Sequence, residues 1–325
     1  MEVKRPPRIC AVCAAVEVEQ CKQCKKCGVL SSRARSHTLA RARSPGKIVY
    51  YCSRRCQKTH WKAGHKGRCI PAAERAAFDT PRNRKKLWET ALRGDWEAVA
   101  ELARRGADVN QSTATHGATV LFVAAGRGGV LAVKELLEAG ADKDAASRTG
   151  ETPLFMAAQE GHENTARVLL EAGADKDRAN DAGRTPLHVA AQKGFDGIAR
   201  ALIDAGADKD RADEEGQTPL YMAAKFGYEP IARALLEAGA DANHADNDGG
   251  TALLACSQNG YEGIVRALLD AGADRTKTIC GYTALELAKT AEMKAILSEY
   301  ANDGAAAAPA FDPRAVRVLC LDDYL

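Results

Sequence analysis

Aromatic side chains are scarce in this sequence: tryptophan, tyrosine and phenylalanine together make up 5% of its 325 residues. No apolar run approaches the roughly 18 residues that a membrane-spanning helix needs. The first residues, Met1 to Arg8, lead into no apolar stretch of the kind that a secretory signal requires. These absences argue against an aromatic-rich sheet core, a membrane protein and a secreted protein. They predict an intracellular protein, in the cytoplasm or the nucleus, with reduced thiols.

Catalytic motifs are also missing. The sequence has no Gly-x4-Gly-Lys-Ser/Thr phosphate loop, and the segment that begins at His162-Glu163 lacks the second histidine of a zinc-protease helix. Cys256, Cys280 and Cys320 stand far apart, and each is interpreted as a small buried apolar residue rather than a nucleophile. The chain is therefore predicted not to be an enzyme and to have no small-molecule substrate.

The net charge of +3 hides an asymmetry. Residues 1–83 carry 19 lysines and arginines against five acidic residues, hence +14, and the remainder carries −11. A basic first part is compatible with binding to nucleic acid or to an acidic protein. Thiolate ligands around a metal ion would lower this positive charge, so nucleic-acid binding is the weaker hypothesis.

Cysteine is concentrated at the start of the chain, where eight of the 11 cysteines lie between Cys10 and Cys69. Thiolate and imidazole are the ligands that Zn²⁺ prefers, and a Cys-x2-Cys pair lets one turn offer two sulfurs to one ion. Two tetrahedral zinc sites need eight ligands. A segment this small buries too little to fold alone, so it is predicted to fold around its metal. The candidates are Cys10, Cys13, Cys21, Cys24, Cys27, Cys52, Cys56, His60, His65 and Cys69.

The end of this segment, from Tyr50 to Cys69, closely resembles the second half of a MYND-type zinc finger. Cys52 and Cys56 are four residues apart, as are His65 and Cys69, so the two members of each pair can share one helical face. In that family, eight ligands bind two ions in interleaved order. The resemblance implies one Zn²⁺ ion on Cys10, Cys13, Cys52 and Cys56, and a second on Cys24, Cys27, His65 and Cys69.

Two ligand choices stay open on spacing alone. Cys21/Cys24 and Cys24/Cys27 both have two intervening residues, and the second pair is favoured because Lys22 to Cys27 is similar to the family's second pair. His65 is favoured over His60 because the family's histidine ligand precedes a lysine and stands four residues before the last cysteine. Residues 28–46 depart from the family pattern, and are interpreted as a solvated loop between ligands or as an unspliced segment of the gene.

The middle of the chain carries an internal repeat. Its threonines recur at an almost constant interval, and a Gly-Ala-Asp marker recurs in the same phase. In one unit, Thr185 can cap a helix that begins at Pro186, and Gly206 can end the next helix in a left-handed conformation. The threonines are Thr119, Thr152, Thr185, Thr218, Thr251 and Thr283.

This unit resembles the ankyrin repeat, which has a period of about 33 residues and the signature T-P-L-H-x-A. His188 completes the signature, so it is interpreted as a structural hydrogen-bonding residue. The resemblance predicts a mostly α fold, in which a small two-zinc MYND module precedes an α-solenoid of ankyrin repeats. The expected plan is a finger at 1–70 with an insert at 28–46, a linker at 71–83, a repeat array at 84–301 with caps at 84–110 and 282–300, and a flexible tail at 302–325.

Both families imply protein binding. MYND fingers bind short proline-containing segments, and Gln57 and Trp61 match the peptide-binding positions. Within the tail, 309–313 is similar to such ligands, and 315–321 is apolar enough to dock on some surface. Ankyrin arrays bind proteins along their turn tips and inner helices. The candidates here are Arg148, Arg184 and Glu214 in the turns and Phe122, Phe155, Tyr221 and Leu254 in the helices, although packing between repeats is favoured for the last four.

The sequence therefore predicts a non-enzymatic scaffold that binds zinc through its finger and partner proteins through the finger and the array. Two alternatives are carried with it: an adaptor similar to a ubiquitin ligase, because interleaved two-zinc modules also recruit conjugating enzymes, and a regulator associated with nucleic acid.

Overall fold

A computed structural model describes residues 78–300 of the chain. The predicted zinc ligands, most of the predicted linker and the predicted tail lie outside these residues. The described part divides into two compact units, which are described separately below. One comprises residues 78–111 and 134–141, and the other comprises residues 112–133 and 142–300.

The first unit contains α3 (Pro81–Arg93), α4 (Trp96–Arg105) and the second half of α6 (Val130–Glu138). The Thr80 side chain accepts a hydrogen bond from the Asn83 N–H, with Pro81 in the first helical position, and Gly94 ends α3 in a left-handed conformation. Helix α3 thus begins inside the segment that was expected to be a linker. The sequence reading overlooked Thr80-Pro81, which is the same start signal that opens the later repeats.

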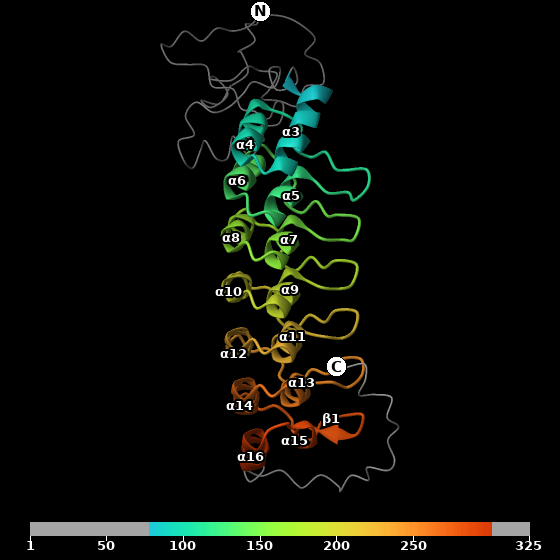
Figure 1. The fold of residues 1–325 in the computed structure, drawn as a ribbon, viewed down its shortest axis with the longest axis vertical. Coiled ribbons are helices and arrows are strands. Elements are labelled where there is room, and N and C mark those ends of the chain that lie inside the picture. Colours follow the sequence, from blue (N-terminus) through green and yellow to red (C-terminus); the bar gives the residue numbers. More distant parts are fainter. Residues whose placement is uncertain (1–77, 301–325) are drawn as a thin grey trace, which may run out of the picture. The chain divides into compact units, whose positions relative to one another are not determined.

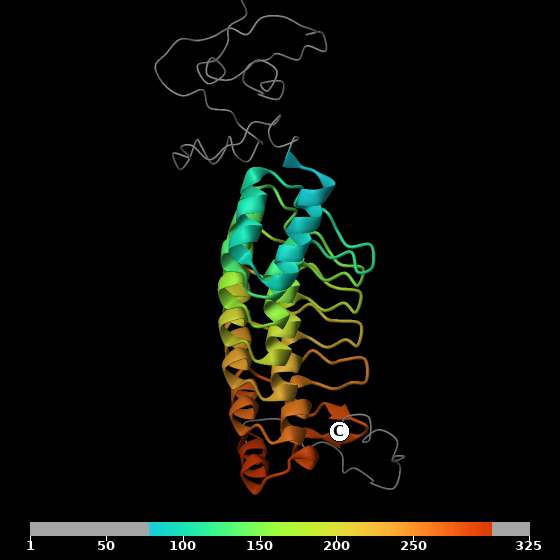
Figure 2. The same cartoon turned by 45° about the horizontal axis from the view of Figure 1, so that its top comes forward.

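The second unit stacks pairs of helices. The first helices of the pairs pack on one another in sequence order, as do the second helices, and the long turns project from the first helices (Figures 1 and 2). The first helices are α5 (Val120–Gly126), α7 (Pro153–Gln159), α9 (Pro186–Lys193), α11 (Pro219–Phe226), α13 (Ala252–Asn259) and α15 (Ala284–Leu287). The second helices are α8 (Glu163–Glu171), α10 (Asp196–Asp204), α12 (Glu229–Glu237), α14 (Glu262–Asp270) and α16 (Ala291–Glu299).

Each first helix begins at the predicted threonine. The Thr185 side chain accepts a hydrogen bond from the His188 N–H, and the same cap recurs at the other threonines of this unit. Behind the cap, Leu187, Ala190 and Ala191 are fully buried. Small residues at these positions let successive first helices approach closely, which explains why an alanine-rich chain with few aromatic residues still forms a dense core.

Glycines at the ends of the first helices leave room for aromatic rings at the start of the second helices of the next repeat. Gly194 has φ +78°, which favours glycine, and a side chain there would overlap the ring of Tyr228 in the next repeat. Gly161 and Phe195 repeat this arrangement one unit earlier. A ring at the start of these second helices therefore packs over the glycine of the preceding repeat.

The last turn is a tight antiparallel hairpin of β1 (Thr278–Ile279) and β2 (Tyr282–Thr283). Cys280 and Gly281 connect the strands with φ +51° and +84°, the two-residue turn that matches strand twist. Cys256 is fully buried, as the sequence predicts, whereas Cys280 is only half-buried because it forms this turn. Within residues 78–300, the helices are too short or too polar to cross a membrane.

Thr165 offers a test of the core. It is fully buried in α8, and its hydroxyl has no hydrogen-bond partner. Its equivalents in the next three repeats are Ile198, Ile231 and Ile264. A buried hydroxyl without a partner costs about 1–3 kcal/mol, so Thr165→Val is expected to stabilise the protein by about 1 kcal/mol. Urea unfolding followed by the helical signal measures the change.

The same substitution at a capping position is the matched control. Thr152 is equally buried, but its hydroxyl accepts a hydrogen bond from the Phe155 N–H at 3.1 Å. Thr152→Val should lower the free energy of unfolding by about 1 kcal/mol because the cap is lost. A loss of stability for both variants would contradict this account of Thr165.

Candidate protein-binding surface

Each long turn is closed by one polar side chain near its start. Asp213 Oδ1 accepts hydrogen bonds from the Glu215 and Gln217 N–H groups at 3.1 and 2.8 Å. The Asp213 N–H donates to the Gln217 carbonyl at 3.0 Å, which completes the loop. This local pattern holds the turn from its base. The equivalent residues are Ser147, Asn180 and Asp246.

Successive turns are joined by backbone hydrogen bonds. The Glu214 N–H donates to the Ala182 carbonyl at 3.1 Å, and the Asn247 N–H donates to the Glu215 carbonyl at 3.0 Å. The same bond joins Arg148 to His116 and Asp181 to Thr149. The turns therefore form one connected row, and exposed side chains at their tips can contact another molecule without breaking these bonds.

The Gly-Ala-Asp marker builds a second connected row. The Asp208 N–H donates to Asp177 Oδ1 at 2.7 Å, and the Asp241 N–H donates to Asp210 Oδ1 at 2.7 Å. Asp208 Oδ1 in turn accepts from the Asp210 N–H at 3.1 Å. Backbone donors to carboxylates make charge-assisted bonds, so the N–H of the marker aspartate, which donates to the aspartate two residues after the preceding marker, ties these repeats together.

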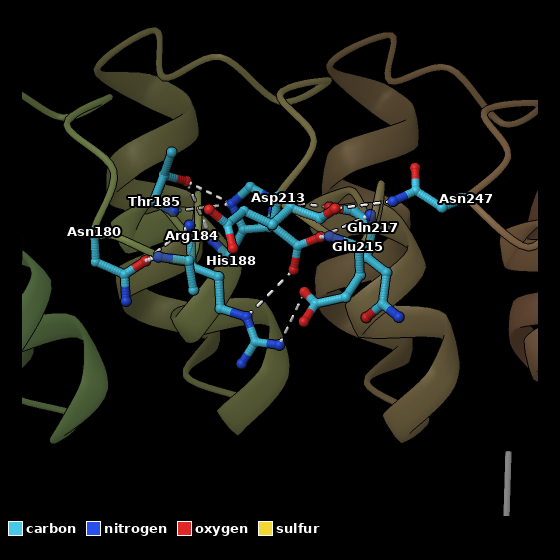
Figure 3. Close-up of polar contacts among 10 residues, drawn as sticks. Asn180, Arg184, Thr185, His188, Asp213, Glu215, Gln217 and Asn247 are labelled. Atoms are coloured by element: carbon cyan, nitrogen blue, oxygen red, sulfur yellow. Dashed lines mark hydrogen bonds and ion pairs between the residues drawn. The ribbon is translucent and has the colours of Figure 1, made fainter. Parts of the chain in front are cut away.

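Arg184 crosses from one turn to the next. Its Nε lies 3.2 Å from Asp213 Oδ2, and its guanidinium reaches Glu215 at 3.5 Å (Figure 3). The Asp213 side chain is fully buried, so its charge needs the two backbone N–H groups and the guanidinium together. The sequence offered Arg184 as a partner contact. The structure instead uses half-buried Arg184 to compensate a buried carboxylate.

His188 joins the third repeat of this unit to the fourth. Its Nδ1 accepts a hydrogen bond from the Thr185 N–H at 3.1 Å, which leaves Nε2 to donate to the Gln217 carbonyl at 3.0 Å (Figure 3). The ring is fully buried. The predicted structural role is confirmed. The pKa of His188 is lowered to about 4, chiefly because burial disfavours the charged ring; the nearby charges of Arg184 and Arg211 contribute to the shift, and the bond to Gln217 opposes it.

Most of the apolar candidates in the first helices are packing residues. Phe155, Tyr221 and Leu254 are 2–3% exposed, so they confirm the favoured interpretation, and Phe122 is half-buried. Arg148 and Glu214 are exposed at the turn tips, as the sequence predicts. The surface that remains is therefore mainly polar.

Phe226 is the exception, and the sequence reading missed it. This residue ends α11 and is 41% exposed. The equivalent residues of four other repeats are polar and exposed: Arg127, Glu160, Lys193 and Asn259. An aromatic residue at a position that is otherwise polar was the available signal, because burial between repeats cannot explain it.

The predicted metal and peptide sites lie outside the described residues. These are the zinc candidates between Cys10 and Cys69, including His65, and the peptide-binding candidates Gln57 and Trp61. Among residues 78–300, no group of three or more histidine, cysteine, aspartate or glutamate side chains is arranged to hold a metal ion.

Comparisons with protein families match both parts of the chain. The model of the MYND finger matches residues 10–69. The model of ankyrin repeats in three copies matches residues 87–180 and 177–246, and the single ankyrin repeat matches residues 248–278. All of these are non-catalytic interaction domains. No curated protein matches the chain.

Two solved structures are similar to the array. One is the ankyrin repeat domain of Bcl-3, described as a unique member of the IkappaB protein family. It is 29% identical, with a TM-score of 0.58, and the match covers 68% of this chain and 98% of that one. The other is the human ASB11 ankyrin repeat domain, 29% identical with a TM-score of 0.59, covering 68% and 99%.

The low pKa of His188 makes stability depend on pH. The unfolded chain takes up the proton near pH 6.5 and the folded chain only near pH 4, so the stabilisation is complete above pH 6.5. It should be lost progressively as the pH falls from 6.5 to 4, by at most about 3 kcal/mol. Urea unfolding at pH 7.5 and pH 5 should show a smaller difference for His188→Gln than for the unchanged chain.

His116→Gln is the control for this prediction, because His116 is exposed in a turn and contacts Thr115. It should retain the full pH dependence. An equal pH dependence in His188→Gln and the unchanged chain would mean that His188 does not carry it.

Proposed function

Because the chain is an ankyrin-repeat protein that carries a MYND zinc finger ahead of its repeats, we propose that it acts as a non-enzymatic scaffold. The observation that carries the proposal is the presence of two different interaction modules in one chain. The finger binds one protein and the array binds another, so the two partners are held together.

The array binds through its turn tips and the exposed end of α11. The turns hold their shape through bonds at their base and backbone bonds to the neighbouring turn, so acidic side chains at the tips can serve binding. Glu214, Glu215 and Asp248 present exposed carboxylates, and Phe226 presents an exposed ring. Aromatic residues are over-represented among binding hot spots. The expected partner therefore carries basic groups and an apolar pocket for Phe226.

The finger holds two Zn²⁺ ions in a structural role. The donor set fits this metal, because seven thiols and one imidazole divide into a Cys₄ site and a Cys₃His site. Cys10, Cys13, Cys52 and Cys56 bind one ion, and Cys24, Cys27, His65 and Cys69 bind the other. Bound zinc supplies folding free energy to a segment that has too little apolar surface to fold alone.

The finger binds an extended, proline-containing peptide. Gln57 and Trp61 stand between the third and fourth ligand pairs, where the family binds its ligands. A polyproline helix loses little entropy on binding, and a tryptophan ring provides a flat surface for it. The proposed domain plan is a finger at 1–70 with an insert at 28–46, joined by a short linker to the repeats.

Zinc content tests the finger. Elemental analysis of the purified full chain should find two zinc ions per chain. Cys27→Ser and His65→Ala should each lower this number because each removes a ligand. A chelator should unfold the finger but leave the helical signal of the repeats unchanged, since those helices are stabilised by packing on one another.

Cys21→Ser and His60→Ala are the matched controls, and both should keep two ions. Zinc loss with Cys21→Ser but not with Cys27→Ser would replace the second pair with Cys21 and Cys24. The complete absence of stoichiometric zinc would remove the finger's part of the proposal.

Two substitutions test the scaffold. Proximity labelling in cells should lose one set of proteins with Phe226→Gln and a different set with Cys52→Ser. Phe226→Gln mimics the polar residues of the other repeats, so it should leave the fold intact. Once a partner of the array is identified, this variant should weaken its affinity at least about tenfold.

Leu131→Gln is the control, because Leu131 is similarly exposed at 48% but lies on α6 and not on a first helix. It should retain every partner. The loss of the same proteins with Phe226→Gln and with Cys52→Ser would argue for one joint binding site instead of two.

A further inference from the structure

One leucine position distinguishes the end of the array from its interior. The leucine that follows each capping threonine by two residues is at most 1% exposed in five repeats, whereas in the last repeat Leu285 is 43% exposed. The five buried residues are each followed by another repeat, and α15 is followed by none in residues 301–325. They are Leu121, Leu154, Leu187, Leu220 and Leu253.

A second position on the last repeat is basic where the others are apolar. The fourth residue of each second helix is fully buried in α8, α10, α12 and α14, where it is alanine or valine. In α16 it is Lys294, which is exposed. Lys289, in the turn between α15 and α16, is exposed as well. Two acids lie near these lysines in sequence: Glu286, which is engaged by the Thr283 N–H and hydroxyl at 2.8 Å each, and Glu292, which is exposed.

The last repeat thus offers an apolar side chain together with two lysines. We propose that residues 315–325 of the same chain pack on this repeat, over Leu285 and beside Lys289 and Lys294. This intramolecular contact takes the place of a further repeat, and it is independent of the scaffold function proposed above.

The chemistry of the segment 315–325 matches this surface. Val316, Val318, Leu319 and Leu321 supply apolar side chains, and Asp322 and Asp323 follow them with two carboxylates. The apolar residues would bury Leu285, and the carboxylates would lie near the lysines. Arg317 interrupts the apolar residues, and the two acids that follow them complement an exposed leucine flanked by lysines.

The connection is long enough for this contact. Helix α16 ends at Glu299, and the stretch 301–314 separates the array from the segment. A chain of that length spans up to about 46 Å, several times the diameter of a helix of about 10–12 Å. Because the segment is tethered to the repeat that it covers, its effective concentration is high, and a small contact area suffices.

Hydrogen exchange of the full chain tests the proposal. Leu319→Asp combined with Leu321→Asp should raise amide exchange in residues 282–300 severalfold and leave residues 112–217 unchanged. These substitutions lie outside the repeats, so they do not alter the array itself. Pro309→Ala combined with Pro313→Ala is the matched control in the same tail, and should leave exchange unchanged.

Two further arms separate a direct contact from an indirect effect. Asp322→Lys with Asp323→Lys should also raise exchange in residues 282–300, and adding Lys289→Glu with Lys294→Glu should restore protection. In a chain that carries Leu285→Asn, the leucine substitutions in the tail should have no further effect.

Unchanged exchange in the Leu319 and Leu321 double variant would overturn the proposal. An effect that grows with protein concentration would overturn it too, because the segment would then cover a second copy of the chain. A continued effect in the Leu285→Asn background would show that the segment binds elsewhere.

Discussion

The hydrogen bonds that join each long turn to the turn before it are the constraint on which the array depends. They fix the spacing of the repeats, and at that spacing the alanines of successive first helices, such as Ala190 and Ala223, are fully buried. His188 and the aspartates of the Gly-Ala-Asp marker add bonds across the same boundary. An isolated repeat would leave these polar groups unpaired and its alanine face in water.

The residues that hold the repeats together, called the frame below, are different from the residues that form the proposed binding surface. Threonine caps, glycine turns, buried leucines and the polar residue that closes each turn hold the frame, and they recur with little change. The side chains at the tips vary more, from the exposed Arg148, which donates to the Ala114 carbonyl of the preceding turn, to the exposed Glu214 and Asp248. The surface is therefore particular to this chain, although the frame that displays it is shared with other ankyrin arrays.

The sequence predicted the frame because every frame residue repeats at a fixed interval. It predicted the surface poorly because exposure depends on what stands in the neighbouring repeat. Burial of Tyr221 between repeats is favoured from the sequence and confirmed, whereas Phe226, which departs from the polar residues at its position, is exposed and was missed. Asp213 is a charged residue in a polar turn, and only the geometry shows that two backbone N–H groups and Arg184 allow it to be buried.

The two modules draw their stability from different sources, and this difference suits a scaffold. In the proposed scaffold, the finger would gain its folding free energy from bound zinc, whereas each repeat gains it from the repeat beside it. Neither source depends on the other, so a change in one module need not disturb the partner of the other. The chain between Cys69 and Thr80 joins the two. That short connection spans at most about 36 Å, so proteins held by finger and array would be kept at high effective concentration.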